Sequence, residues 1–184
     1  KMKFSVNQQD LQKSLNYCQG VIEKRSTLPI LSNVLLSASN SGLVITATDL
    51  DLIFINKIKN IEIIEEGTTT TSSSIMYDII RKFTSGKKIN LSLSSESKLQ
   101  LESEKSIFHL NCINSSEFPL TDENFSQNEF SLKSKELLKL LNKCKFSVSN
   151  DETRHYLSGV YFHQTEIEDK VYLTAAATDS HRMS

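Results

Sequence analysis

The sequence predicts an α+β fold in which a strand–helix–strands unit is used twice and the helices lie on one face of antiparallel sheets. One observation behind this prediction is an internal repeat, found when the chain is compared with itself. The residues that coincide at an offset of 126 are Phe4 with Phe130, Leu11 with Leu137, Leu15 with Leu141, Cys18 with Cys144 and Leu31 with Leu157. The other observation is that apolar residues change from helical spacing to alternation along each copy. The chain is therefore interpreted as a duplicated domain.

The first copy begins with a predicted strand at residues 4–6. Asn7 is the expected N-cap of a helix, because Leu11, Leu15, Cys18 and Ile22 follow at near-helical spacing. Strands are then expected at residues 33–36 and 43–46.

The first copy also has an internal second half. Residues 68–74 lead into a predicted helix at 75–83, with Ile75, Ile79, Ile80 and Phe83 expected on one side. Alternating residues then predict three strands, at 89–93, 98–102 and 106–113.

The second copy repeats only the first part of this order. A strand is predicted at residues 130–132, a helix at 134–145 and strands at 160–163 and 171–174. The predicted domains are therefore 1–118, complete, and 130–184, which lacks a second half; the acidic and polar segment 119–129 is the expected linker. The chain is accordingly expected to be truncated within its second domain.

Composition limits the class of protein. The 184 residues are 38% hydrophobic and 23% charged, as in globular proteins, and the formal net charge is −1. The N-terminal residues run straight into polar residues, so no apolar core of a signal peptide is expected, and no apolar run approaches the ~18 residues that a membrane helix needs. Three Cys without paired spacing indicate reduced thiols rather than disulfides or a metal site. We therefore expect a cytoplasmic protein with no membrane association.

The charge is unevenly divided. Residues 8–25, 76–88 and 133–145, which contain the predicted helices, hold 12 Lys and Arg against 4 Asp and Glu, a balance of +8, and the rest of the chain carries −9. On the third helix, Lys135, Lys139 and Lys143 form a stripe opposite Leu137 and Leu141. The stripe has two interpretations: an ordinary solvated helix face, or a surface that follows a phosphate backbone without reading sequence.

Longer motifs are more specific. Residues 25–34 (RSTLPILSNV), followed by residues 47–51 (ATDLD), resemble the opening of the bacterial sliding-clamp family, the beta subunit of DNA polymerase III. In the second copy, residues 146–149 (FSVS), 152–160 (ETRHYLSGV) and 177–183 (ATDSHRM) resemble the same family. The resemblance covers essentially the whole chain.

The resemblance implies the DNA-clamp fold, in which domains of this type form a homodimeric ring around duplex DNA, with helices lining the hole and sheets outside. It implies a processivity factor that an ATP-driven clamp loader places on DNA. Such a ring tethers the polymerase III catalytic subunit and other polymerases, which bind through short linear motifs. Sliding requires attraction without base-specific bonds.

The resemblance also implies site residues. Arg25, His155 and Tyr156 match positions near the DNA, although His155 replaces a frequent Tyr and Asp151 places an acid where some members have a neutral residue. Phe108 and Leu110, on a predicted edge strand, resemble one side of the dimer interface. The residues that match one wall of the pocket for partner peptides are Arg154, Leu157, Thr178, Ser180, His181, Arg182 and Met183. Ser180 replaces a frequent Gly, which would narrow that wall.

Other interpretations remain beside these. Leu157 and Met183 could be core residues, and Phe108 and Leu110 could face inward. The run Asp179-Ser180-His181 holds the residue types of a hydrolase triad, but adjacent residues point in different directions, so no enzyme activity is expected. Asp49 and Asp51 are too few ligands for a metal, and no cofactor is expected. The alternative function is a domain that recruits proteins without encircling DNA.

Overall fold

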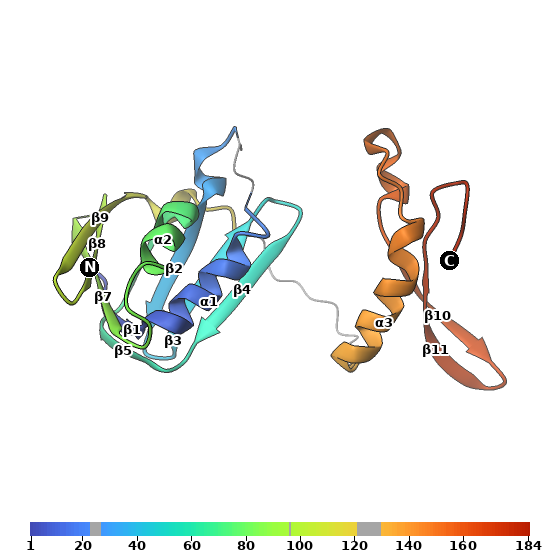
Figure 1. Ribbon diagram of the computed structural model, residues 1–184, viewed down its shortest axis with the longest axis horizontal. Helices are drawn as coiled ribbons and strands as arrows, with labels where there is room; N and C mark the ends of the chain where they lie inside the picture. Colours follow the sequence, from blue (N-terminus) through green and yellow to red (C-terminus); the bar gives the residue numbers. More distant parts are fainter. Residues whose placement is uncertain (23–26, 96, 121–129) are drawn as a thin grey trace. The chain divides into compact units, whose positions relative to one another are not determined.

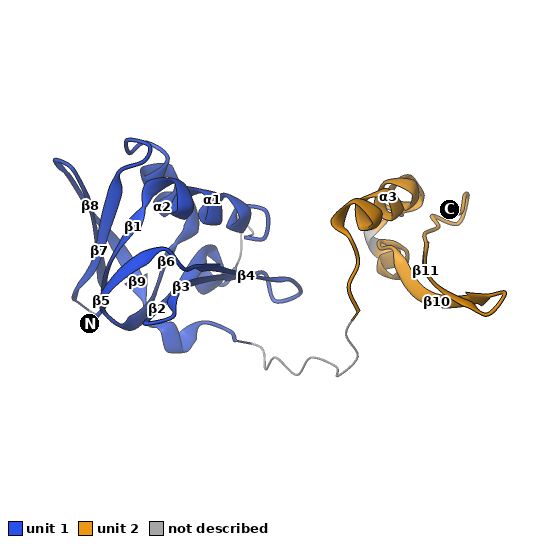
Figure 2. Ribbon diagram, turned by 90° about the horizontal axis from the view of Figure 1, so that it is seen from below, with its two compact units in different colours: residues 1–122 blue, residues 123–184 orange. Residues whose placement is uncertain are grey.

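The computed structural model describes residues 1–22, 27–95, 97–120 and 130–184. The chain divides into two compact units, Lys1–Asp122 and Glu123–Ser184 (Figure 2). Most of the expected linker, residues 121–129, and the candidate DNA-binding residue Arg25 lie outside the described residues. Each unit is described by itself.

Unit 1 contains antiparallel strands in the order β4-β3-β2-β6-β9-β8-β7-β1-β5. The strands are β1 (Lys3–Asn7), β2 (Asn33–Ser39), β3 (Gly42–Thr48), β4 (Ile53–Ile58), β5 (Ile61–Glu65), β6 (Gly67–Ser72), β7 (Lys88–Ser95), β8 (Lys98–Ser103) and β9 (Ser106–Ile113). Helices α1 (Gln8–Cys18) and α2 (Ser73–Ile80) lie side by side over one face of these strands (Figure 1). The predicted α+β class, with helices on one face of antiparallel sheets, is confirmed.

Helix α1 begins where the sequence predicts. The Asn7 side chain accepts a hydrogen bond from the Gln9 N–H at 2.9 Å, which satisfies an otherwise unpaired donor of the first turn. Leu11, Leu15 and Cys18 are fully buried on its inner face. A single core cluster joins these residues to the strands of both halves of unit 1. Burial of this continuous apolar surface is the main stabilising contribution to the unit.

The predicted apolar face of α2 is partly wrong. Met76 and Ile80 are fully buried, whereas Ile75 is 54% exposed. The helix begins at Ser73, capped by Ser72, and ends at Ile80, so Ile75 lies in the first turn on the outer side. Ile79 and Phe83 pack against the core only in part.

Three strands of unit 1 were not predicted as strands: β4, β5 and β6, whose residues were expected only to lead into a helix. β4 lies at one end of the strand order, and its burial alternates along the strand. Its exposed positions include Ile53 and Ile55, so the sequence lacks the alternation of apolar and polar residues that marks a half-buried strand. β5 lies at the other end and pairs with β1, between Phe4 and Ile63 among other positions.

The two halves of unit 1 meet where β6 pairs with the end of β9. Only Thr70 with Ile113 and Thr71 with Cys112 are paired there. Side chains add to this short ladder, because the Thr70 hydroxyl donates to the Ile113 carbonyl at 2.8 Å and accepts from the Asn33 amide at 3.0 Å. The junction therefore depends on buried threonines as well as on backbone hydrogen bonds.

Unit 2 contains α3 (Ser134–Cys144), the 3-10 turns η3 (Lys145–Ser147) and η4 (Glu152–Leu157), and a hairpin of β10 (Tyr161–Ile167) and β11 (Lys170–Ala176). α3 contacts β11. The strand predicted at residues 130–132 is wrong. Its counterpart β1 lies between β5 and β7, whereas within residues 130–184 the only paired strands are β10 and β11, and they pair with each other.

Candidate nucleic-acid and peptide interfaces

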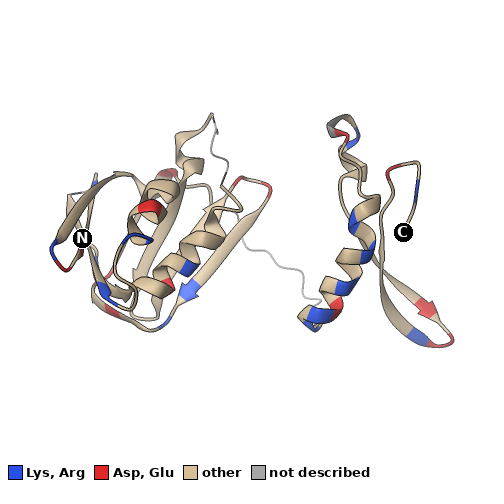
Figure 3. Cartoon of the chain, viewed as in Figure 1, with Lys and Arg blue, Asp and Glu red and all other residues tan. Residues whose placement is uncertain are grey.

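One side of α3 carries the lysine stripe, which consists of Lys135, Lys139 and Lys143. All three are exposed and follow one another at intervals of four residues along the helix. Figure 3 shows that the charged positions on α3 are mostly basic. On the inner side of α3, the Cys144 thiol is buried and lies 3.5 Å from the Ala175 carbonyl oxygen of β11. The helix thus packs on the hairpin by one face and presents three cations on the other.

The other two helices do not repeat this arrangement, so the expectation of three basic helices is wrong. α1 carries Lys13 and Asp10, and α2 carries Asp78 and no cation. Four basic residues follow α2, and three of them form ion pairs at the surface. These pairs are Arg81 with Asp78 at 3.1 Å, Lys87 with Glu104 at 3.9 Å and Lys88 with Glu62 at 3.3 Å.

His155 and Tyr156 lie on η4 and are both exposed, Tyr156 to 72%. Their rings meet edge to face, with centroids 5.9 Å apart. Asp151 caps this turn by accepting the Thr153 N–H at 3.0 Å, and it also accepts from Arg154 Nε at 2.8 Å. The Thr153 hydroxyl, followed by Arg154, lowers the pKa of the Asp151 carboxyl.

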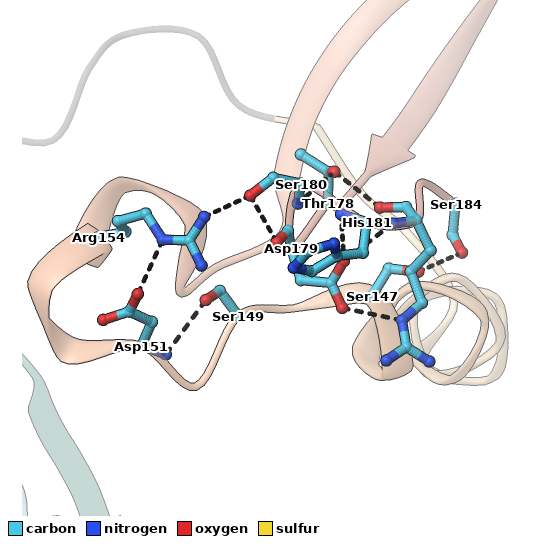
Figure 4. Close-up of polar contacts among 10 residues, drawn as sticks. Ser147, Ser149, Asp151, Arg154, Thr178, Asp179, Ser180, His181 and Ser184 are labelled. Atoms are coloured by element: carbon cyan, nitrogen blue, oxygen red, sulfur yellow. Dashed lines mark hydrogen bonds and ion pairs between the residues drawn. The ribbon is translucent and has the colours of Figure 1, made fainter.

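Residues 178–183 form a loop that is held by its own polar groups (Figure 4). Asp179 Oδ1 accepts the N–H groups of His181 and Arg182, each at 2.9 Å, and Oδ2 accepts from Arg182 Nε at 2.8 Å. These bonds, first the one from His181, lower the pKa of the Asp179 carboxyl to about 2. The Thr178 hydroxyl accepts the Ser180 N–H at 3.1 Å, and Ser180 adopts a φ of +74°.

This loop and η4 border one hollow of about 310 Å³. It is lined by Tyr156, Leu157, Gly159, Tyr161, Ala176, Ala177, Thr178 and Met183. Leu157, Thr178 and Met183 are thus predicted pocket residues that the fold brings together. Met183 is 76% exposed, so the alternative that it is a core residue is wrong.

The remaining predicted pocket residues lie around the hollow rather than in its lining. Arg154 Nη1 donates to the Ser180 hydroxyl, which joins η4 to the 178–183 loop, and His181 and Arg182 are exposed. Sequence reasoning missed Tyr161, which begins β10. It also assigned Tyr156 to DNA alone, although Tyr156 lines this hollow. Their only signal in the sequence is an aromatic residue on either side of the turn at residues 157–160.

Phe108 and Leu110 differ in exposure although both lie on β9. Leu110 is 6% exposed and belongs to the core opposite Leu99, so its inward-facing interpretation is the correct one. Phe108 is 40% exposed, and its ring lies 5.7 Å from that of Phe83. The described strands pair with one side of β9 throughout, but with the other side only at Cys112 and Ile113.

The side chains of the candidate triad (Asp179-Ser180-His181) and of the candidate metal pair (Asp49 and Asp51) are accounted for by hydrogen bonds within their own loops. Asp179 accepts from the backbone of His181, not from its imidazole, and the Ser180 hydroxyl donates to the Asp179 carbonyl at 2.6 Å. Asp49 Oδ1 likewise accepts the N–H groups of Asp51 and Leu52. Within the described residues no three His, Cys, Asp or Glu side chains are grouped to hold a metal ion. The described helices are too short and too polar to cross a membrane.

Comparison with known proteins gives a consistent result over both units. Residues 2–122 match the family model for the N-terminal domain of the DNA polymerase III beta subunit, and residues 131–184 match that for its central domain. The beta sliding clamp of Caulobacter vibrioides is 35% identical over 185 residues, and that of Escherichia coli K12 is 34% identical over 183. These alignments cover 100% of this chain and 49% of each relative, so the chain spans about half the length of its curated relatives.

Solved structures agree with these relatives. A Caulobacter crescentus beta sliding clamp superposes with a TM-score of 0.94 at 35% identity, over 99% of this chain and 48% of that one. A Bacillus subtilis DNA polymerase sliding clamp superposes with a TM-score of 0.91 at 25% identity, over 99% and 48% of the two chains.

Proposed function

The chain belongs to the DNA polymerase III beta subunit family, and from this membership we propose that it forms part of a ring-shaped processivity factor that encircles duplex DNA. The ring slides without sequence specificity and tethers replicative and repair polymerases. It is a non-catalytic accessory subunit, acts in the cytoplasm and is placed on DNA by a clamp loader. Residues 1–118 and 130–184 contribute two of its domains, joined by the linker 119–129.

The proposal that this protein binds DNA is supported by the lysine stripe on α3. Three exposed ammonium groups on one helix attract phosphates but carry no pattern of donors and acceptors that matches base edges. A surface of this kind holds DNA at every position along its length, as sliding requires. Tyr156 and His155, exposed on η4 of the same unit, extend the proposed DNA-binding surface. Arg25, which lies outside the described residues, stays a separate prediction from the family resemblance.

The proposal that subunits assemble into a ring is supported by β9, because one side of this strand is paired only at Cys112 and Ile113. A strand with unpaired backbone groups on one side pairs readily with a strand of another subunit. Phe108 supplies exposed apolar area beside this side of the strand. Leu110 is buried within its own subunit, so we assign the apolar contact with the partner to Phe108 and not to Leu110.

DNA topology tests the ring. A full-length clamp that contains these 184 residues is loaded on a nicked circular plasmid, and the retained protein is measured by gel filtration before and after the circle is cut once. We expect retention on the circle and release from the linear molecule. Equal retention on both would favour the alternative, a protein-recruitment domain that does not encircle DNA.

The hollow between η4 and the 178–183 loop is the proposed site for partner peptides. Its lining of Tyr, Leu, Ala and Met side chains suits a short segment with an apolar side chain. Because the Met183 side chain is exposed at this hollow, Met183→Ala in the full-length protein should weaken binding of a polymerase-tail peptide several-fold. Ile167→Ala, at the far end of β10, removes a comparably exposed apolar side chain and is the matched control. An unchanged dissociation constant for Met183→Ala would remove this residue from the site.

A further inference from the structure

Three residues connect the two walls of the hollow. Asp151 accepts from Arg154 Nε at 2.8 Å, and Arg154 Nη1 donates to the Ser180 hydroxyl. The same hydroxyl donates to the Asp179 carbonyl at 2.6 Å, so both of its roles are used (Figure 4). We call this connected set the Asp151–Arg154–Ser180 bridge. It joins η4, which supplies Tyr156 and Leu157 to the hollow, to the loop that supplies Thr178 and Met183.

Ser180 is an unusual residue for its backbone conformation. Its φ of +74° lies in the left-handed region, which favours glycine because glycine has no Cβ to strain there. A serine is held at this position by the Thr178 hydroxyl on its N–H and by the two hydrogen bonds of its own side chain. Glycine would adopt this backbone conformation with less strain but would leave Arg154 without this acceptor.

The bridge also determines the charge beside the hollow. Arg154 and Arg182, the two guanidinium groups of these walls, are each paired with an aspartate three residues earlier, at 2.8 Å in both cases. Arg154 and Asp151 are about equally exposed, 36% and 38%, so a ligand that reaches the arginine also meets the carboxylate. A carboxylate on the ligand gains little from a cation that is already neutralised.

We propose that the Asp151–Arg154–Ser180 bridge determines the specificity of the hollow: it fixes the separation of the two walls and neutralises Arg154, so that a short peptide is selected by its apolar side chains and not by an acidic residue. This inference rests on the proposed peptide site. Preorganised walls favour binding because little order is lost when the peptide enters. Asp151 and Ser180 therefore act as positioning residues for Arg154.

A matched pair of peptides tests this proposal with a full-length clamp that contains these 184 residues. Both are acetylated and amidated pentapeptides with three apolar residues that suit the lining of the hollow, and they differ only at the central position, which is Asn in one and Asp in the other. Dissociation constants are measured by fluorescence anisotropy at low and high salt. The wild type should bind the two peptides equally within about twofold.

Two variants separate the two parts of the bridge. Asp151→Asn keeps a capping side chain for η4 but frees the charge of Arg154, so the Asp peptide should bind about three- to tenfold more tightly than the Asn peptide, and this preference should disappear in 0.5 M salt. Ser180→Gly suits the positive φ of the backbone and removes the hydrogen bond that joins the two walls. Both peptides should then bind about threefold more weakly, with no preference for either one.

The outcomes are distinct. If the wild type binds both peptides but prefers the Asp peptide as strongly as Asp151→Asn does, or if Ser180→Gly binds both as the wild type does, the bridge does not set specificity, and the peptide site itself survives. If neither peptide binds the wild type or a variant, the proposed peptide site is wrong and the specificity proposal falls with it. A preference in Asp151→Asn that persists in 0.5 M salt would show a change of shape instead of charge and would also overturn the proposal.

Discussion

The hairpin of β2 and β3 offers a sharp test of how closely unit 1 is packed. Gly42 begins β3 with a φ of +123°, and a Cβ built on it would lie 2.4 Å from the Ile58 carbonyl oxygen of the neighbouring β4. Gly86 has a φ of +78°, but a Cβ on it would meet nothing within 4 Å. Alanine at either position suffers the same kind of backbone strain, and only Gly42→Ala adds a steric clash with backbone.

The magnitudes follow from these two terms. A left-handed conformation costs a non-glycine residue about 1–2 kcal/mol. The lower entropy of the unfolded alanine chain offsets about 0.4–1 kcal/mol of this, which leaves about 1 kcal/mol for Gly86→Ala. Moving the β4 carbonyl by about 1 Å to relieve the clash costs about 2 kcal/mol more, typical of overpacking. Gly42→Ala should therefore lose about 3 kcal/mol of unfolding free energy.

Pulsed alkylation of Cys18 measures this loss in unit 1 alone. The Cys18 thiol is fully buried, and burial raises its pKa to about 12, so it reacts only when unit 1 unfolds. With a urea dependence of about 2 kcal/mol per molar, the midpoint should fall by about 0.5 M for Gly86→Ala and about 1.5 M for Gly42→Ala. Equal midpoints for the two variants would refute the clash and with it the close approach of β3 to β4.

Three further predictions concern the DNA surface, the 178–183 loop and the junction of the sheets. Replacing the lysine stripe with glutamines should reduce the slope of log affinity for duplex DNA against log salt by about 2–3, whereas replacing three exposed strand lysines of unit 1 should leave the slope unchanged. The hydrogen bonds of the loop lower the pKa of the Asp179 carboxyl from 3.8 to about 2. The ionised carboxylate therefore stabilises the loop fully above about pH 3.8, and this stabilisation is lost as the pH falls to about 2. An NMR titration of this carboxyl with a midpoint near 3.8 would contradict the loop geometry. Thr70→Val removes two buried hydrogen bonds and should lower the free energy of unfolding, measured by thermal unfolding, by about 1–3 kcal/mol. Thr68→Val, at an exposed position, should lower it by less than about 0.5 kcal/mol. Similar losses in the two variants would mean that the Thr70 hydrogen bonds contribute nothing to stability.

Local features of the fold were predictable. Asn7 caps α1 as expected, because capping requires only a short polar side chain ahead of a helical run. The burial of Leu11 and Leu15 followed from their spacing. Elements that depend on distant partners were not predictable: residues 130–132 have the composition of β1 but no neighbouring strand within residues 130–184, and β4 was missed because its place at the edge of the strand order leaves Ile53 and Ile55 exposed.

The candidate site likewise has features that the sequence predicts and features that only the fold brings together. The lysine stripe could be found from the sequence, since helical spacing alone aligns Lys135, Lys139 and Lys143. The expected basic bias of α1 was wrong because the helix itself carries one Lys and one Asp. That of α2 was wrong because the cations counted with it follow the helix, where surface carboxylates pair with three of the four. Met183 and Tyr161 come together only because β10 and β11 pair and the loop after β11 folds back.

The sequence by itself therefore determined the repeat, the capped and amphipathic helices, the alternating strands and the family, because each of these is written in residue types at short, regular spacing. The tertiary structure decided which of these residues meet. It buries Leu110 while Phe108 remains exposed, closes the hollow between η4 and the 178–183 loop, and carries Arg154 to Ser180 across 26 positions of the chain. Contacts of this kind arise from packing and strand pairing between distant segments, and no local pattern specifies them.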